Sequence, residues 1–100
     1  MADFCITAVR YNMAKTHIDY VEVHEEINRN GNISLGNLRT VARAFVADLI
    51  RLKKASFITR VKNADGTYRY GADVHTIDTE YLTTDKNSTT RDNLGSLPTF

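Results

Sequence analysis

The chain has 100 residues, a formal net charge of +1, 42% hydrophobic residues and one cysteine. This length suits one small domain and excludes two, and the apolar content is typical of a globular protein. No apolar run approaches the roughly 20 residues of a membrane-spanning helix, and no signal-peptide pattern begins the chain. The single cysteine, Cys5, excludes an internal disulfide. We therefore expect a cytoplasmic protein without a membrane partner.

Two strands are predicted at the start of the chain. In residues 3–11, apolar side chains occur at both odd and even positions, so both faces of a strand there are fairly apolar. This pattern is typical of a strand buried on both faces. Residues 18–24 alternate more cleanly between apolar and polar side chains, and the polar stretch between the two runs predicts a hairpin. Residues 25–37 are interpreted as a connector, with a turn signal at Asn30-Gly31.

Helical periodicity is concentrated in residues 35–54. Apolar side chains recur there at three- and four-residue steps, which places them on one stripe of a helix. The stripe consists of Leu38, Val41, Ala42, Phe45, Leu49 and Leu52, and it is widened by Val46 and Ile50. We predict a single long helix with Ser34 or Asn37 as its N-cap and Phe45 as its main anchor in the core.

A second hairpin is predicted after the helix. Residues 57–62 and 68–77 alternate on either side of an Asp-Gly pair, which predicts a tight turn with a positive φ at Gly66. Within the second of these strands, Gly71 indicates a bulge or the close approach of another chain segment.

The end of the chain is predicted to contain one more strand and a tail. Residues 81–84 form the short fifth strand, and residues 85–92 are a mobile polar loop without aliphatic side chains. In the tail, Leu94, Leu97 and Phe100 are candidate anchors on the core.

The order ββαβββ predicts one α+β domain over residues 1–100, with one amphipathic helix packed across an antiparallel sheet of about five strands. With one helix, the other face of the sheet must be polar, covered by the tail or covered by a second subunit. The apolar first strand and the tyrosines favour a homo-oligomer or a ligand-facing sheet. These tyrosines are Tyr11, Tyr20, Tyr68, Tyr70 and Tyr81.

Four segments carry a resemblance to a known family: FCITAVR at 4–10, GADVH at 71–75, YLTTD at 81–85 and DNLGSLP at 92–98. Together they resemble the small bacterial family labelled domain of unknown function 3892, over nearly the whole chain. The most specific part is the ending. The resemblance implies a compact bacterial protein and supplies no activity, cofactor or catalytic residue.

The residues that could carry chemistry form no recognisable motif. Cys5, His17, His24 and His75 are chemically suitable zinc ligands, but none of them has the paired spacing of a zinc site. Cys5 is interpreted as a small buried apolar residue. There is no nucleophile-elbow sequence and no glycine-rich phosphate loop. We therefore predict no metal, no cofactor, no catalytic residue and no enzyme activity.

Charged residues are unevenly distributed: acidic residues predominate in 1–28 and 70–100, and basic residues in 39–69. The favoured interpretation is that these segments neutralise each other in the fold. The alternative is a nucleic-acid-binding surface over residues 51–69, where cations are interleaved with aromatic side chains, although the pI near 7.9 is low for a dedicated binder. Its candidate residues are Arg51, Lys53, Lys54, Arg60, Lys62 and Arg69.

The leading functional prediction is a non-enzymatic interaction or structural module that self-associates, with a protein partner left open. A nucleic-acid-associated module is the alternative, and an enzyme comes third.

Overall fold

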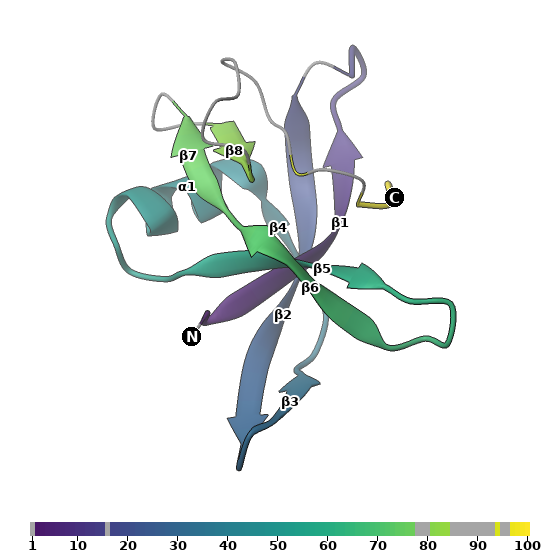
Figure 1. Cartoon of the computed structure of the whole chain (residues 1–100). Coiled ribbons are helices and arrows are strands. Elements are labelled where there is room, and N and C mark those ends of the chain that lie inside the picture. The colour runs from purple at the N-terminus through teal and green to yellow at the C-terminus, as the bar shows by residue number, and fades with distance from the viewer. Residues whose placement is uncertain (1, 16, 78–80, 85–93, 95–96) are drawn as a thin grey trace.

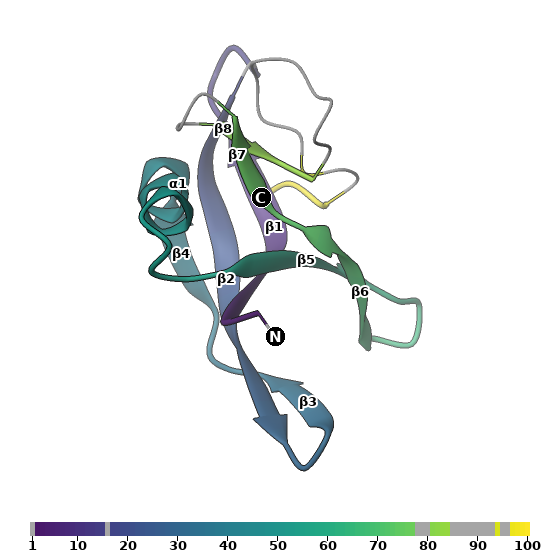
Figure 2. The ribbon, with the colours of Figure 1, turned by 60° about the vertical axis from the view of Figure 1, so that its left-hand side comes forward.

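The computed structural model describes residues 2–15, 17–77, 81–84, 94 and 97–100. A curled, half-barrel sheet with one short helix beside it forms the architecture (Figures 1 and 2), so the predicted α+β class is confirmed. The predicted loop at 85–92 lies outside the described residues. The elements are β1 Phe4–Tyr11, β2 Ile18–Arg29, β3 Asn32–Leu35, β4 Arg39–Ala42, α1 Arg43–Arg51, β5 Phe57–Lys62, β6 Tyr68–Asp73, β7 His75–Ile77 and β8 Tyr81–Thr83.

The main sheet is mixed, so the prediction of an antiparallel sheet was wrong in one pairing. Its strands follow the order β3-β2-β1-β5-β6, and β4 also pairs with β2. β1 runs antiparallel to β2 but parallel to β5, with Phe4 opposite Phe57. Parallel neighbours need a long crossover. Here the chain between β1 and β5, including α1, provides it.

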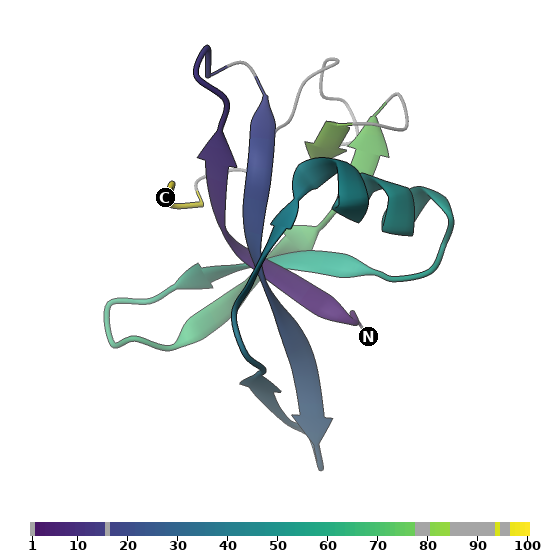
Figure 3. The same cartoon turned by 180° about the vertical axis from the view of Figure 1, so that it is seen from behind.

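The predicted connector at 25–37 is instead a two-stranded arm. β2 continues to Arg29, the chain turns at Asn30 and Gly31, and β3 returns antiparallel to β2. Both turn residues have positive φ, which confirms the turn signal. The arm extends away from α1 in every view (Figure 3) and buries little of its surface, so its sequence lacks the apolar alternation of a core strand.

Helix α1 is shorter than predicted. It has nine residues, and residues 39–42, assigned to the helix from the sequence, form β4 with Val41 opposite Val21. The N-cap residue is Ala42 with no side-chain cap bond, so the prediction of Ser34 or Asn37 was wrong. Among the described residues, no helix combines the length and apolar character needed to cross a membrane.

The residues that anchor α1 also differ from the prediction. Val46 and Ala47 are its buried side chains, whereas Phe45 is 55% exposed. The prediction that Phe45 is the core anchor was therefore wrong. Three residues of the predicted stripe, Leu38, Val41 and Ala42, precede the true helix. Without them, the apolar face of α1 is shifted by one residue from the predicted one.

The core lies between β1, β2, α1, the β7–β8 hairpin and the tail. Five consecutive residues of β1, from Cys5 to Val9, are buried, which confirms that this strand is covered on both faces. Leu94 and Leu97 are buried, which confirms their prediction as anchors of the tail. The tail also pairs with β1 through Val9. Phe100 instead stays partly exposed beneath the Arg10 guanidinium. The apolar faces of β1 are thus covered by the chain itself.

The second hairpin is close to its prediction. Gly66 has a φ of 89°, which confirms the tight turn. Gly71 confirms a close approach: a Cβ there would collide with Thr59 Oγ1 and lie 3.0 Å from the Thr59 carbonyl oxygen. The predicted strand at 68–77 is divided between β6 and β7 at the buried Val74, whose N–H donates to the Phe57 carbonyl.

Candidate functional site

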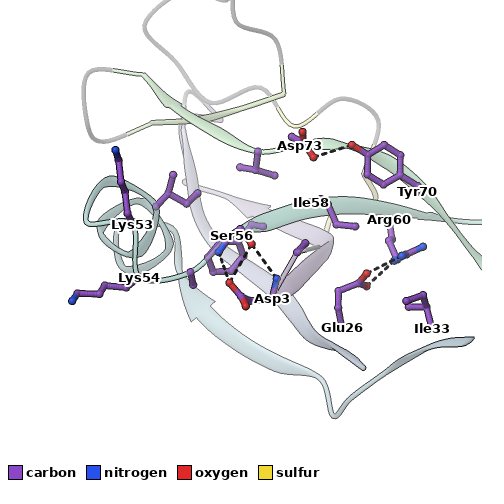
Figure 4. A pocket seen from close by; sticks show the side chains of 15 residues that line it. Asp3, Glu26, Ile33, Lys53, Lys54, Ser56, Ile58, Arg60, Tyr70 and Asp73 are labelled. Atoms are coloured by element: carbon purple, nitrogen blue, oxygen red, sulfur yellow. Dashed lines mark hydrogen bonds and ion pairs between the residues drawn. The ribbon is translucent and has the colours of Figure 1, made fainter. Parts of the chain in front are cut away.

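The concave side of the curled sheet encloses a hollow of about 710 Å³, which we call the groove. Side chains from β2, β3, β5, β6 and the segment after α1 line it (Figure 4). The polar lining residues are Asp3, Glu26, Lys53, Lys54, Ser56, Arg60, Tyr70 and Asp73, and the apolar ones include Ile33, Ile50, Ile58 and Val74.

A bidentate ion pair crosses the floor of the groove. Arg60 Nε and Nη2 donate to the two carboxylate oxygens of Glu26 at 2.7 and 2.8 Å. The Glu26 side chain is 3% exposed and that of Arg60 14% exposed. Hydrogen bonds from Arg60 hold the pKa of Glu26 below its ordinary value, and those same bonds raise the pKa of Arg60. The pair ties β2 to β5 across the intervening β1.

Cys5 lies on β1 beneath this ion pair and has no exposed surface. Burial, followed by a hydrogen bond to Glu26, raises the pKa of the Cys5 thiol to about 12. The thiolate is the nucleophilic form of cysteine, so the thiol at neutral pH is inert. The interpretation of Cys5 as a small buried residue is confirmed.

The other two carboxylates of the groove are also engaged within the chain. Asp3 Oδ2 accepts from the Ser56 N–H at 2.8 Å and from its hydroxyl at 3.1 Å. The Tyr70 hydroxyl donates to Asp73 at 2.9 Å, which raises the pKa of Tyr70. None of the described lining residues is a histidine that could activate either hydroxyl. These contacts organise the groove walls and supply no activated nucleophile.

The predicted cationic surface is divided by internal contacts. The charge of Arg60 is directed at Glu26 inside the groove. Arg51 pairs with Asp48 at 3.2 Å on the outside of α1, and Arg69 donates to the Asn63 side-chain oxygen at 2.7 Å. Arg60 of the basic segment pairs with Glu26 of the acidic segment, as the hypothesis that these segments neutralise each other requires.

The lysines of the predicted basic segment are exposed. Lys53 and Lys54 follow α1 at the edge of the groove, and Figure 4 shows both ammonium ends pointing away from its centre. Lys62 lies at the end of β5. The six candidate residues therefore do not share one surface within the groove.

The histidines that were considered as zinc ligands, and rejected on their spacing, lie in separate environments. The His17 ring stacks on Tyr81 with centroids 4.5 Å apart, and His24 Nδ1 donates to the Gly36 carbonyl oxygen at 2.9 Å. His75 lies in β7. Within the part of the chain that the structure describes, no group of three potential ligands is placed to hold a metal. The absence of a metal stays a prediction.

A second hollow, of about 250 Å³, lies between α1 and the strands β2 and β4. We call the surface around it the helix-side face. Its lining is mostly apolar: Phe4, Val23, Val41, Val46, Leu49 and Phe57. Glu25, Asn37, Arg39 and the exposed Phe45 complete it.

The charged side chains of the helix-side face differ from the carboxylates of the groove in having no partner within the described chain. Within the described chain, the side chains of Glu25 and Arg39 have no hydrogen-bond or ion-pair partner, and both residues are exposed. Sequence reasoning missed these two residues because it assigned one to a connector and the other to the helix. Arg39 takes its place through the pairing of residues 39–42 with 20–23, where Val41 faces Val21, and no local sequence signal predicts that pairing.

The chain belongs to the family described as "Protein of unknown function (DUF3892)", whose model matches residues 5–98. This match confirms the resemblance that the sequence indicated. No curated protein and no solved structure matches the chain.

Proposed function

We propose that this member of a family of unknown function is a non-enzymatic interaction module that self-associates. The observation that carries the proposal is the exposed Phe45, which lies beside the apolar hollow of the helix-side face. An exposed aromatic side chain beside an apolar recess is typical of a protein–protein contact.

The state of the groove supports a role without catalysis. Its carboxylates Asp3, Glu26 and Asp73 accept hydrogen bonds from within the chain, and the Cys5 thiol is buried and uncharged. None of the described lining residues pairs a hydroxyl or thiol nucleophile with a histidine base, the arrangement that activates such a nucleophile. A reducing cytoplasmic compartment is part of the proposal, since a lone thiol is typical of such proteins.

Sedimentation velocity over a concentration series from about 1 to about 100 µM tests this proposal, because weak dimers dissociate within that range. We expect the weight-average sedimentation coefficient to rise with concentration toward that of two copies, and to fall again on dilution. A single monomeric boundary at every concentration would overturn the proposal.

A further inference from the structure

We infer that two copies meet through the helix-side face around a two-fold axis. In this arrangement the Phe45 ring of each protomer enters the apolar hollow of its partner, and Glu25 of each protomer pairs with Arg39 of the other. The inference rests on the proposed self-association and assigns the surface through which it occurs.

The first argument is the position of Phe45 relative to the hollow. Phe45 lies in the first turn of α1 with 55% of its surface exposed, at the edge of a hollow that it does not fill. Its neighbour one turn later, Leu49, forms part of the lining. A projecting ring beside an apolar recess is self-complementary, because a two-fold axis places each ring over the recess of the other copy. Aromatic anchors in pockets of this kind supply most of the energy of an interface.

The second argument is charge. Arg39 lies opposite Val23 in the β2–β4 pairing, and Glu25 follows Val23 by two residues on the same face of β2. Opposite charges are therefore held side by side at one edge of the hollow. Neither side chain has a partner within the described chain. An isologous interface requires one surface to carry both members of each contact, and Glu25 with Arg39 meets that requirement.

Charge reversal tests the pairing directly. Glu25→Arg leaves two cations at this edge and Arg39→Glu leaves two anions, so each variant alone repels its own copy. We expect each to weaken self-association by about tenfold or more. An equimolar mixture of the two variants should form a heterodimer, and the double variant Glu25→Arg/Arg39→Glu should recover the homodimer. Sedimentation velocity with one variant fluorescently labelled measures both outcomes.

Phe45→Ser tests the apolar anchor, with Tyr70→Ser as its control. Both side chains are 55% exposed, but Tyr70 lies in the groove on β6. We expect Phe45→Ser to weaken self-association by about tenfold or more and Tyr70→Ser to leave it unchanged. Circular dichroism of each variant at low concentration verifies that the monomer is folded.

The outcomes separate the two proposals. A wild-type chain that stays monomeric refutes self-association itself. A wild-type chain that associates, with Phe45→Ser and both reversals having no effect, refutes this surface and leaves the proposed function standing. Single reversals that weaken association but do not recombine in the mixture refute the pairing of Glu25 with Arg39.

Discussion

The groove and the helix-side face contain similar kinds of residues but use them differently. In the groove, each carboxylate accepts a hydrogen bond within the chain, and the partly buried Arg60 is held by Glu26. On the helix-side face, Glu25 and Arg39 have no such partner in the described chain. The composition of a surface is therefore a poor guide to its role. What distinguishes the two surfaces is whether their carboxylates already accept hydrogen bonds from within the chain.

The difference has an energetic consequence. A buried ion pair adds little stability relative to an apolar replacement. Removing one partner, however, leaves the other charge unpaired in a poorly solvated site. Exposed charges without partners add almost nothing to folding and remain available for an interface. Disruption of the groove should therefore affect folding, and disruption of the helix-side face should affect association.

Arg60→Ala is expected to have the largest effect on folding. It leaves the Glu26 carboxylate buried without its donor, and such changes cost about 3–5 kcal/mol of unfolding free energy. Arg39→Ala is the matched control. It should change the stability of the monomer by less than about 0.5 kcal/mol, because its side chain is exposed and unpartnered. Chemical denaturation at low protein concentration measures both values. Equal losses in the two variants would show that the contrast between the two surfaces is incorrect.

A smaller contrast is expected within α1, between the neighbours Val46 and Phe45. Val46 is fully buried, so Val46→Ala removes two buried carbon atoms and should cost about 2 kcal/mol. Phe45→Ala should cost the monomer less than Val46→Ala, although it removes the larger side chain, because more than half of the Phe45 surface is already exposed to water. The same denaturation series measures both. A greater loss from Phe45→Ala than from Val46→Ala would restore Phe45 as the core anchor.

Local signals in the sequence predicted much of the sheet. The strand β5 agrees with its prediction residue for residue, and the turn at Gly66 follows from an Asp-Gly pair between alternating runs. The burial of Leu94 and Leu97 in the tail was also predicted. Each of these features depends on neighbours in the sequence or on apolar side chains that have no other place to be buried.

The helix could not be delimited in this way. Leu38, Val41 and Ala42 have helical spacing relative to Phe45, yet β4 binds residues 39–42 to an existing strand and satisfies their backbone groups there. Pairing with β2 is a tertiary contact, and no local pattern encodes it. With those residues removed from the helix, the buried face of α1 passes through Val46 instead of Phe45.

The candidate sites were predicted least well, for the same physical reason. Glu26 and Arg60 are 34 residues apart. The sequence predicted that the acidic and basic segments neutralise each other, but it did not predict which residues pair. Only the curling of the sheet across β1 brings the two side chains together. The exposure of Phe45 likewise depends on where the helix begins, which tertiary pairing decides.

The last and smallest expected effect is the response of the Glu26–Arg60 ion pair to acid. Arg60 lowers the pKa of Glu26 in the folded protein, so its ionised form stabilises the fold above the ordinary value of 4.5, and this contribution is lost as pH falls through the lower folded pKa. We expect the unfolding free energy of the wild type and Glu26→Gln to differ by a constant amount from about pH 7 to about pH 6, and to converge below pH 4.5. Denaturation curves at several pH values measure this, and a wild-type curve that stays parallel to that of Glu26→Gln below pH 4.5 would contradict the assigned role of the ion pair.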